Sequence, residues 1–233
     1  MAMKKIKVYS EVVYLVAIIM LSFSVAMITS TNFGVSMIVA PAYILSQKLS
    51  FLTFGQSEYI IQGILFIVFC CLMKKVKIVY FSSFLTGIIY GAVLDLWRLI
   101  IPHFNPNITV PGSMAFPLRI IYFVIGALLT SLSVALFFKT YLYPQVYDFF
   151  VKGISNKFSV SRTKFKTGFD ASCLIIASIM TFLFFGKFVG VGIGTIIMTC
   201  FNGLIIGIFG KLLDKIFVFE PIYKEFSKKF ELK

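Results

Sequence analysis

The sequence predicts an all-α polytopic membrane protein with six transmembrane helices and one short additional helix. Hydrophobic residues make up 59% of the 233 residues and charged residues only 13%, whereas about a quarter of the residues in a soluble domain are charged. Continuous apolar runs of about 20 residues, long enough to cross a hydrocarbon core as a helix, recur along the chain. These runs exclude a membrane β-barrel, whose strands alternate polar and apolar residues.

Each expected helix ends where polar, basic or proline-containing residues interrupt the apolar run. The six spans are expected at about residues 11–30, 56–73, 79–101, 117–138, 168–186 and 192–213, within one transmembrane domain that covers residues 1–233. A cytoplasmic loop rich in Tyr and Lys, residues 139–167, is expected between the fourth and fifth spans, and a charged cytoplasmic tail, residues 214–233, after the sixth. The first run is too long for a removable signal peptide and lacks its small-residue cleavage pattern.

A further apolar stretch, residues 36–48, is too short to cross the membrane. It holds about 13 residues, which at about 1.5 Å per residue fall short of a hydrocarbon core of ~30 Å, and Pro41 lies in its middle. We therefore expect a short helix here, and the sequence leaves open whether it is re-entrant or interfacial.

The distribution of basic residues predicts the orientation in the membrane. The formal net charge is +13, and with six spans 18 of the 22 Lys and Arg residues fall on the side of the two termini. Since cytoplasmic segments carry the excess of Lys and Arg, we expect both termini in the cytoplasm. This orientation accounts for the basic charge, so no nucleic-acid partner is expected. The four residues on the other side are Lys48, Arg98, Arg119 and Lys187.

The residue usage is typical of a bacterial protein. Lys outnumbers Arg 19 to 3, and there are 28 Phe residues, a bias that AT-rich bacterial genomes produce. Together with the hydropathy of the spans, this usage predicts a multi-pass protein of the bacterial cytoplasmic (inner) membrane.

The residue types argue against several classes of site. The four cysteines form no CxxC motif and His103 is the single histidine, so no metal site, haem or other cofactor is expected. No Ser-His-Asp or Cys-His set is suggested, and the protein is not expected to be an enzyme. The stretch Gly190-Val-Gly-Ile-Gly-Thr195 lacks the spacing of a dinucleotide fingerprint and the lysine of a P-loop, which argues against nucleotide binding.

Two glycine-containing breaks interrupt the chain at the outer ends of spans. Phe33-Gly-Val-Ser36 follows the first span, and Val189-Gly-Val-Gly192 follows the fifth; an apolar helix comes after each. Such breaks line substrate sites in many transporters, although a glycine-rich loop before a well-packed helix has the same composition. The two breaks are expected to flank one outer polar site, but their offset does not fit a simple three-plus-three inverted repeat.

Asp95 is the most informative charged residue, because ionisable groups at membrane depth are costly and mark functional positions. It follows Gly87 and Gly91 at intervals of four residues, so the three lie along one helix face. Arg98 is its expected ion-pair partner. The pair belongs either to a polar site inside the bundle or to the outer membrane interface.

The other candidates follow from the same topology. Glu58 begins the second span at its outer end, where a polar vestibule is expected, whereas Asp170 is expected to be an interfacial charge at the inner end of the fifth span. Asn202 is expected to bond either across helices or to a substrate. The candidate substrate- and ion-binding residues are Asp95, Glu58, Arg98, Asn32, Ser36, Gly192, Gly194, Thr195 and Asn202, and the expected helix-packing residues are Gly87, Gly91, Gly203 and Gly207.

Four loose motifs stand in an order that is found in a known family. They are Asn32-Phe-Gly-Val-Ser36, Thr53-Phe-Gly55, Gly87-xxx-Gly91-xxx-Asp95 and Gly192-Ile-Gly194-Thr195. In this order the chain resembles the YczE/YyaS/YitT-type bacterial integral membrane proteins, and within them the YczE/YyaS branch, because YitT-type members often carry a soluble C-terminal domain. The resemblance implies a bundle of similar size and helix number, and it implies no defined activity.

The leading functional hypothesis is a small transporter or permease for a small polar or anionic solute. Helix N-termini after the two breaks offer positive dipole ends to such a solute, and Asp95 or Glu58 is the expected coupling group for a cation or proton. The alternatives are a membrane-embedded substrate-binding subunit of an energy-coupling-factor-like transporter and a non-transporting scaffold or regulator. The expected partners are the lipid bilayer, a small-molecule substrate, and either partner subunits or a second copy of the chain.

Overall fold

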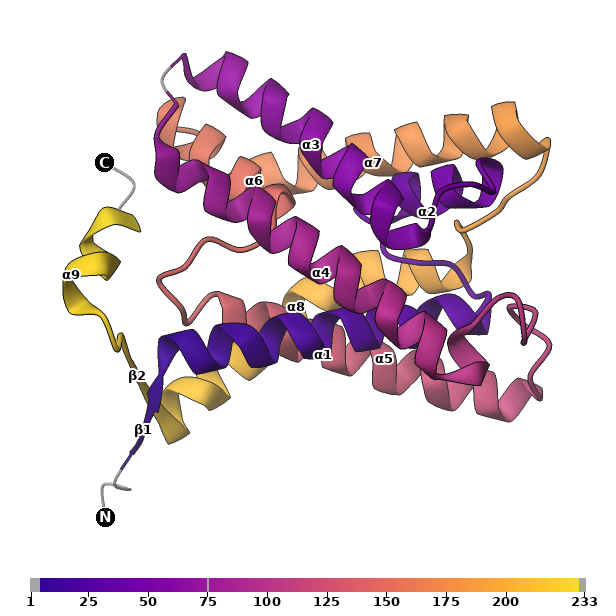
Figure 1. The fold of residues 1–233 in the computed structure, drawn as a ribbon, viewed down its shortest axis with the longest axis horizontal. Coiled ribbons are helices and arrows are strands. Elements are labelled where there is room, and N and C mark those ends of the chain that lie inside the picture. The colour runs from indigo at the N-terminus through magenta and orange to yellow at the C-terminus, as the bar shows by residue number, and fades with distance from the viewer. Residues whose placement is uncertain (1–4, 75, 231–233) are drawn as a thin grey trace.

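A computed structural model of the chain describes residues 5–74 and 76–230 and shows an all-α bundle (Figure 1). Six of its helices are long and apolar enough to cross a membrane, which confirms the predicted polytopic membrane fold. Observed and expected boundaries agree closely, because continuous hydropathy fixes the spans. The six helices are α1 Ser10–Thr31, α3 Phe54–Met73, α4 Phe81–Ile100, α5 Phe116–Phe137, α7 Arg162–Phe185 and α8 Ile193–Ile216.

Short elements complete the fold. Strand β1, Ile6–Tyr9, pairs in parallel with β2, Phe217–Glu220, so that the segments flanking α1 and α8 lie together at one end of the bundle. We call this end the strand end and the opposite one the far end. The remaining elements are α2 Ala40–Lys48, α6 Val146–Lys157, α9 Lys224–Ser227, and the 3-10 turns η1 Ile78–Tyr80, η2 Pro102–Phe104 and η3 Lys228–Phe230.

Helix α2 is the short helix predicted after the first span, and it lies inside the bundle. Helix α1 ends at Asn32, which adopts a left-handed backbone conformation with a φ of 54°, and the chain then turns back into the bundle. Pro41 lies in the first turn of α2, where a missing N–H costs nothing. Tyr43 and Ile44 are buried, and α2 packs against α3 and α7. The helix is therefore re-entrant rather than interfacial.

Helix α6 is a second re-entrant helix, which the sequence did not reveal. The expectation of a polar loop over residues 139–167 is wrong for residues 146–157, because one face of α6 is apolar and buried, with Val146 and Phe149 fully covered. After α5 the chain runs into the bundle, and α6 then runs back toward the strand end (Figure 1). It packs against α3, α4 and α7.

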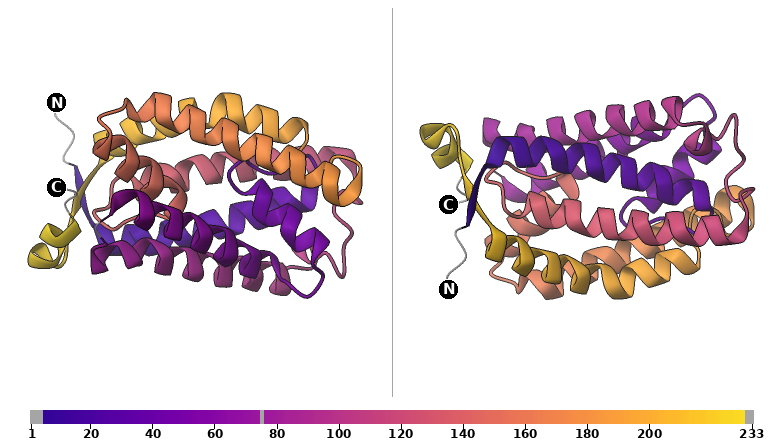
Figure 2. Two further views of the ribbon diagram at one scale, coloured as in Figure 1. Left: turned by 90° about the horizontal axis from the view of Figure 1, so that it is seen from above. Right: turned by 90° about the horizontal axis from the view of Figure 1, so that it is seen from below.

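The chain forms two halves of inverted orientation, α1–α4 and α5–α8. Each half has a spanning helix, a break, a re-entrant helix and two further spanning helices (Figures 1 and 2). The contacts match as well: α1 packs on α5 at the centre, α1–α4 corresponds to α5–α8, α2–α3 to α6–α7, and α3–α6 to α7–α2. The halves form a three-plus-three inverted repeat in which the second re-entrant helix follows α5; the Val189–Gly192 break follows α7 and is therefore not the repeat counterpart of the Phe33–Ser36 break, as their offset indicated.

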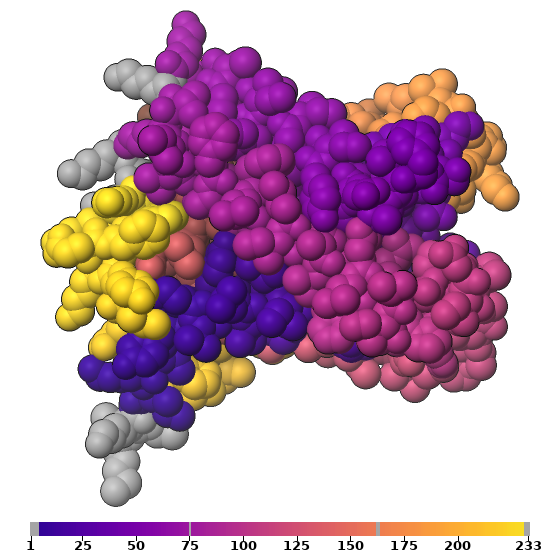
Figure 3. All heavy atoms as spheres, viewed as in Figure 1, coloured from indigo at the N-terminus to yellow at the C-terminus, as the bar shows by residue number. Residues whose placement is uncertain are grey.

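One contact breaks this correspondence. Helices α3 and α4 pack closely, with Gly55 of α3 against Gly91 of α4, where an added Cβ at Gly55 would collide with the Gly91 carbonyl oxygen. No comparable contact joins α7 and α8 among the described residues. Figure 3 shows the closed face, on which side chains of α1, α3 and α4 form a continuous surface. The two halves are thus in different states of closure.

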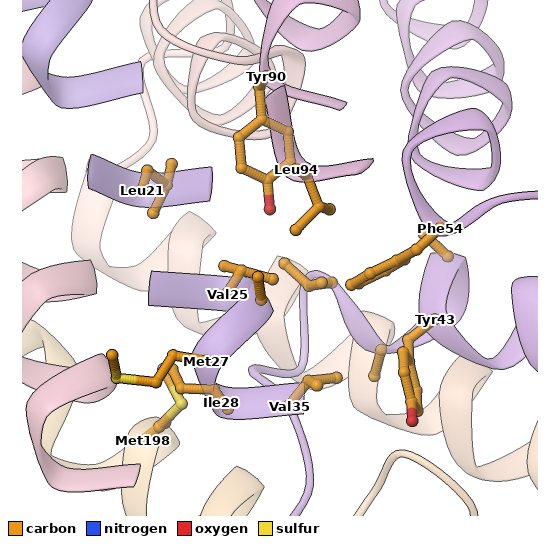
Figure 4. Close-up of a cluster of buried hydrophobic side chains, with 14 of the residues drawn as sticks. Leu21, Val25, Met27, Ile28, Val35, Tyr43, Phe54, Tyr90, Leu94 and Met198 are labelled. Carbon is orange, nitrogen blue, oxygen red and sulfur yellow. The ribbon is translucent and has the colours of Figure 1, made fainter. Parts of the chain in front are cut away.

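The hydrophobic core surrounds α1. Of the most apolar stretch of α1, 56% is buried in the bundle, against 11% for α8, so α1 is central and α8 peripheral. Figure 4 shows the core members Leu21, Val25, Met27, Ile28, Val35, Tyr43, Phe54, Tyr90, Leu94 and Met198.

Candidate functional site: a central cavity between the two halves

A cavity of about 420 Å³ lies between the two halves, within the range of small-molecule sites. Helix α1 lines one wall with Leu21, Val25 and Ile28, and α8 lines another with Met198 and Asn202. Residues of α4, α5, α6 and α7 complete the enclosure. The cavity therefore draws on both halves and on five of the six spanning helices.

Both re-entrant helices begin at this cavity. Val39 and Gln145, the residues that precede the first residues of α2 and α6, both line it. Ser36 and Tyr147 line it beside them. The positive ends of two helix dipoles are thus directed to one enclosed space, an arrangement typical of substrate sites built from discontinuous helices.

The strand end of the cavity is charged. Lys166 of α7 forms an ion pair with Asp170 one turn later, with 3.0 Å between Nζ and Oδ1, and lies 3.8 Å from Asp148 of α6. All three side chains line the cavity. Asp170, expected as an interfacial charge, thus belongs to a group of three charged residues, because α6 folds back and brings Asp148 beside Lys166.

The two predicted breaks lie side by side and are joined by backbone hydrogen bonds, which we call the backbone clasp. The N–H of Val35 donates to the Gly190 carbonyl oxygen over 2.9 Å, and the N–H of Gly194 donates to the Phe33 carbonyl oxygen over 2.8 Å. The Thr195 hydroxyl donates to the Val35 carbonyl oxygen over 2.7 Å. These groups are used in holding the break together, and Gly192, Gly194 and Thr195 do not line the cavity.

Gly34 shows how tight this clasp is. Its φ of 99° favours glycine, and an added Cβ would lie 2.5 Å from the Thr195 hydroxyl oxygen and 2.6 Å from the Gly192 nitrogen. The first break is consequently fixed against the start of α8, and only its inner part, from Val35 to Val39, faces the cavity.

Asp95 serves the α3–α4 interface and not the cavity. It accepts hydrogen bonds from the Gly55 N–H over 2.8 Å and from the Thr53 hydroxyl, and so satisfies the start of α3. The expected ion pair with Arg98 is not formed, because the guanidinium of Arg98 lies over the Phe54 ring, 5.4 Å from its centroid. Asp95 and Arg98, which were expected in one outer polar vestibule, thus make separate structural contacts.

The remaining polar candidates take different places. Asn32 is exposed at the end of α1 and does not line the cavity. Asn202 forms the expected bond across helices, since it accepts a hydrogen bond from Ser131 of α5 over 2.6 Å, and it also lines the cavity.

The four glycines expected to pack helices divide into two pairs. Gly87 and Gly91 lie in close contacts with α3, whereas an added Cβ at Gly203 or Gly207 would have no heavy atom within 4 Å. The expectation that Gly203 and Gly207 pack helices together is not met, because no neighbouring helix covers that face of α8 in this structure.

Glu58 is the candidate with the least ordinary surroundings. It is fully buried, and its Oε2 accepts hydrogen bonds from Gln62 over 3.1 Å and from the Tyr147 hydroxyl over 3.0 Å. The N–H of Val146 donates to Gln62 Oε1 over 3.3 Å. The first turn of α6 therefore joins the Glu58 cluster to the cavity through Tyr147.

Several cavity residues were missed in the sequence. Four of them come from the segment predicted to be a cytoplasmic loop: Gln145, Tyr147, Asp148 and Lys166. Tyr90 comes from a part of α4 without a distinctive motif. The available signal was the spacing of Val146, Phe149, Phe150 and Ile154, which places apolar side chains on one face of a helix. In the described part of the chain, no group of three or more His, Cys, Asp or Glu side chains could hold a metal ion.

One family model matches most of the chain. The model of a family of unknown function, DUF6198, matches residues 8–211. The chain belongs to this family. The match covers all six spanning helices of this DUF6198 protein except the last residues of α8, but it gives no evidence for the YczE/YyaS/YitT resemblance. No curated protein and no solved structure matches the chain.

Proposed function

We propose that this DUF6198 protein is a small carrier that moves a polar solute across the membrane. The observation that supports the proposal best is that two re-entrant helices, one from each inverted half, begin at the same central cavity. Secondary transporters build midplane substrate sites in this way, and they alternate between states in which one half moves against the other.

The unequal closure of the halves supports a carrier more than a fixed pore. The α3–α4 interface is closed around Gly55 and Gly91, while the equivalent α7–α8 side is not. We propose that the structure is one of two states, and that the solute enters from the strand end, where Lys166 and Asp170 line the cavity. In the other state α7 and α8 would close and α3 and α4 would part.

The lining indicates a small solute with a polar or charged group and a short apolar portion. The charged strand end and the two helix N-termini provide polar partners, while Leu21, Val25, Ile28 and Met198 provide an apolar wall. By the positive-inside rule, the strand end faces the cytoplasm of the bacterial inner membrane.

The test combines two-sided labelling with uptake. The variant Asn202→Cys, in a chain whose four native cysteines are replaced by alanine, places one thiol on the cavity wall. Leu204→Cys is the matched control, because Leu204 lies two residues away and is 66% exposed on the outside of α8. Proteoliposomes of known orientation are treated with a membrane-impermeant thiol reagent from each side, with and without members of a radiolabelled metabolite panel.

We expect the thiol of Asn202→Cys to react from both sides, with a transported solute changing the ratio of the two rates and the Leu204→Cys control unaffected. Reaction from one side only under every condition would contradict a carrier. Co-purification of a stoichiometric ATPase would favour the substrate-binding subunit of a larger transporter. One-sided reaction without any uptake or ligand-dependent thermal shift would leave a scaffold or regulator.

A further inference from the structure

Glu58 is a buried acid without a cationic partner. Its side chain is fully buried in α3, and none of the ion pairs formed by the described residues includes it. Both of its hydrogen bonds reach the same oxygen, Oε2, and Oε1 has no partner among the described residues. A charged carboxylate in this position carries a large desolvation cost that two neutral donors reduce only in part.

The surroundings of Glu58 are built to hold its neighbours in one orientation. Gly87 of α4 leaves the space that the Gln62 carboxamide occupies, since an added Cβ there would collide with Gln62 Oε1. That oxygen accepts the N–H of Val146, so the amide nitrogen of Gln62 points to Glu58. Three helices, α3, α4 and α6, thus cooperate in placing one hydrogen-bond donor.

Two further buried groups lack partners in this region. In the part of the chain that the structure describes, the Tyr90 hydroxyl and the Gln145 amide nitrogen have no hydrogen-bond partner, although both residues line the cavity. Figure 4 shows the Tyr90 hydroxyl pointing away from α4 into the core. Unsatisfied buried polar groups are rare and costly, and here two of them lie on the cavity wall next to Tyr147, the residue that contacts Glu58.

The geometry suits a proton better than a metal cation. A sodium ion needs several converging oxygen atoms, whereas the groups nearest to Glu58 Oε2 are an amide N–H and a hydroxyl that donate toward it. A proton on the carboxyl group removes the charge, whose burial is costly. The charged form keeps two donors at Oε2, so both forms fit the same pocket.

Other titratable groups near Glu58 are few. Tyr90 of α4 is close enough to interact electrostatically with Glu58 and with Asp95. Tyr147 of α6 forms a hydrogen bond with Glu58. Cys173 of α7 interacts electrostatically with Tyr147. Tyr43 of α2 interacts electrostatically with Arg98. The charged residues Asp148, Lys166 and Asp170 line the same cavity as Tyr147.

We propose that Glu58 is the proton-binding site of the carrier and that Tyr147 links its protonation to the cavity. The Tyr147 hydroxyl, which lines the cavity, passes its proton to the Glu58 carboxylate and takes one from a hydronium ion in the cavity, which becomes water; the reverse step returns the proton to water. The inference rests on the proposed carrier function, to which it adds the coupling ion.

The experiment measures proton binding without any solute. Infrared difference spectra of the full-length protein in lipid nanodiscs are recorded while pH is varied from mildly acidic to mildly alkaline. The carbonyl stretch of a protonated carboxyl group is the readout. Glu58→Gln removes the titrating group and keeps the shape of the side chain, and Asp95→Asn is the control for a carboxylate of the α3–α4 interface.

The link to the cavity is measured on the same preparations. A bimane fluorophore on Asn202→Cys, in the cysteine-free chain, reports the polarity of the cavity as pH changes. Tyr147→Phe keeps the ring and removes the hydroxyl that donates to Glu58. Circular dichroism checks that each variant is folded.

We expect a carboxyl band that titrates in the wild type and in Asp95→Asn and is absent in Glu58→Gln. The bimane emission should change with pH in the wild-type background and lose this change in Glu58→Gln and Tyr147→Phe. A pH-independent band assigned to Glu58, or a bimane response that persists in Glu58→Gln, would overturn the proposal. Because neither readout involves transport, this failure differs from one-sided labelling of the cavity, which contradicts the carrier itself.

Discussion

The α3–α4 interface and the α7–α8 side hold equivalent positions in the two halves, but only the first is closed. At the α3–α4 interface, Gly55 and Gly91 bring two backbones together, and Asp95 secures the start of α3. On the other side, Gly203 and Gly207 of α8 have open space around them. Small residues therefore occur on both sides, and their presence alone does not decide which helices are in contact.

The two re-entrant helices support the spanning helices of their neighbouring halves unequally. Helix α6 packs against both α3 and α4, so the closed side is supported from within, whereas the corresponding contact of α2 with α8 is not formed to a comparable extent among the described residues. The cavity between the two halves extends to this less supported side, where Lys166 of α7 and Asn202 of α8 line it. Exchange of these two arrangements is the motion that the proposed carrier requires.

The largest effect is expected from filling the closed interface. Gly55→Leu places a side chain against the backbone of Gly91, and we expect it to destabilise the fold by about 3 kcal/mol or more, the upper range for overpacking. Gly207→Leu, the control on the open side, should leave the thermal-unfolding midpoint in detergent nearly unchanged. Equal losses for both variants would show that the α7–α8 side is closed in the membrane.

A cross-link should separate closure from stability. Gly63→Cys and Phe84→Cys lie on facing surfaces of α3 and α4, since an added Cβ at Gly63 is 3.5 Å from the Phe84 ring. A short bifunctional maleimide between them should abolish solute uptake, because α3 and α4 then stay together. Labelling of Asn202→Cys from the strand side should persist. Unchanged uptake in the cross-linked protein would mean that the α3–α4 interface does not open.

The sequence was sufficient for the spans and for one of the two re-entrant helices. Hydropathy set the boundaries of the long helices, and Pro41 in a short apolar stretch identified α2. Helix α6 was missed because its charged residues Asp148, Lys152 and Lys157 resemble those of a cytoplasmic loop. One apolar helix face is visible in a sequence, but the neighbour that covers it is not.

The candidate site was less predictable than the fold. Ser36 and Asn202 do line the cavity, whereas Asp95, Asn32 and Thr195 serve helix ends or the backbone clasp. Topology places residues at one depth in the membrane, and it does not say which helices are lateral neighbours. Glu58 illustrates this limit, since its partner Tyr147 is 89 residues away in the sequence.

A pair of acid variants should separate the interface from the cavity. Asp95→Ala removes the acceptor for the Gly55 N–H and the Thr53 hydroxyl, and we expect a loss of about 1.5–3 kcal/mol, as for hydrogen bonds to a charged group. Asp170→Ala removes one of two acids beside Lys166 and should cost less stability while reducing uptake. Thermal melting and uptake on the same preparations distinguish the two, and a reversed order would move the site to the α3–α4 interface.

The smallest effect is expected at the contact that holds α8 to α5. Ser131→Ala removes the hydroxyl that donates to Asn202 over 2.6 Å, and interhelical hydrogen bonds of this kind contribute on average about 0.6 kcal/mol in membranes. The fold should therefore be nearly unaffected. Asn202 would lose the bond that fixes its carboxamide on the cavity wall. The apparent affinity for a transported solute should therefore fall, while the melting temperature should change little. Ser133→Ala is the matched control, because its hydroxyl bonds within α5 to Leu129. A change in affinity as large in Ser133→Ala as in Ser131→Ala would show that Asn202 does not contact the solute.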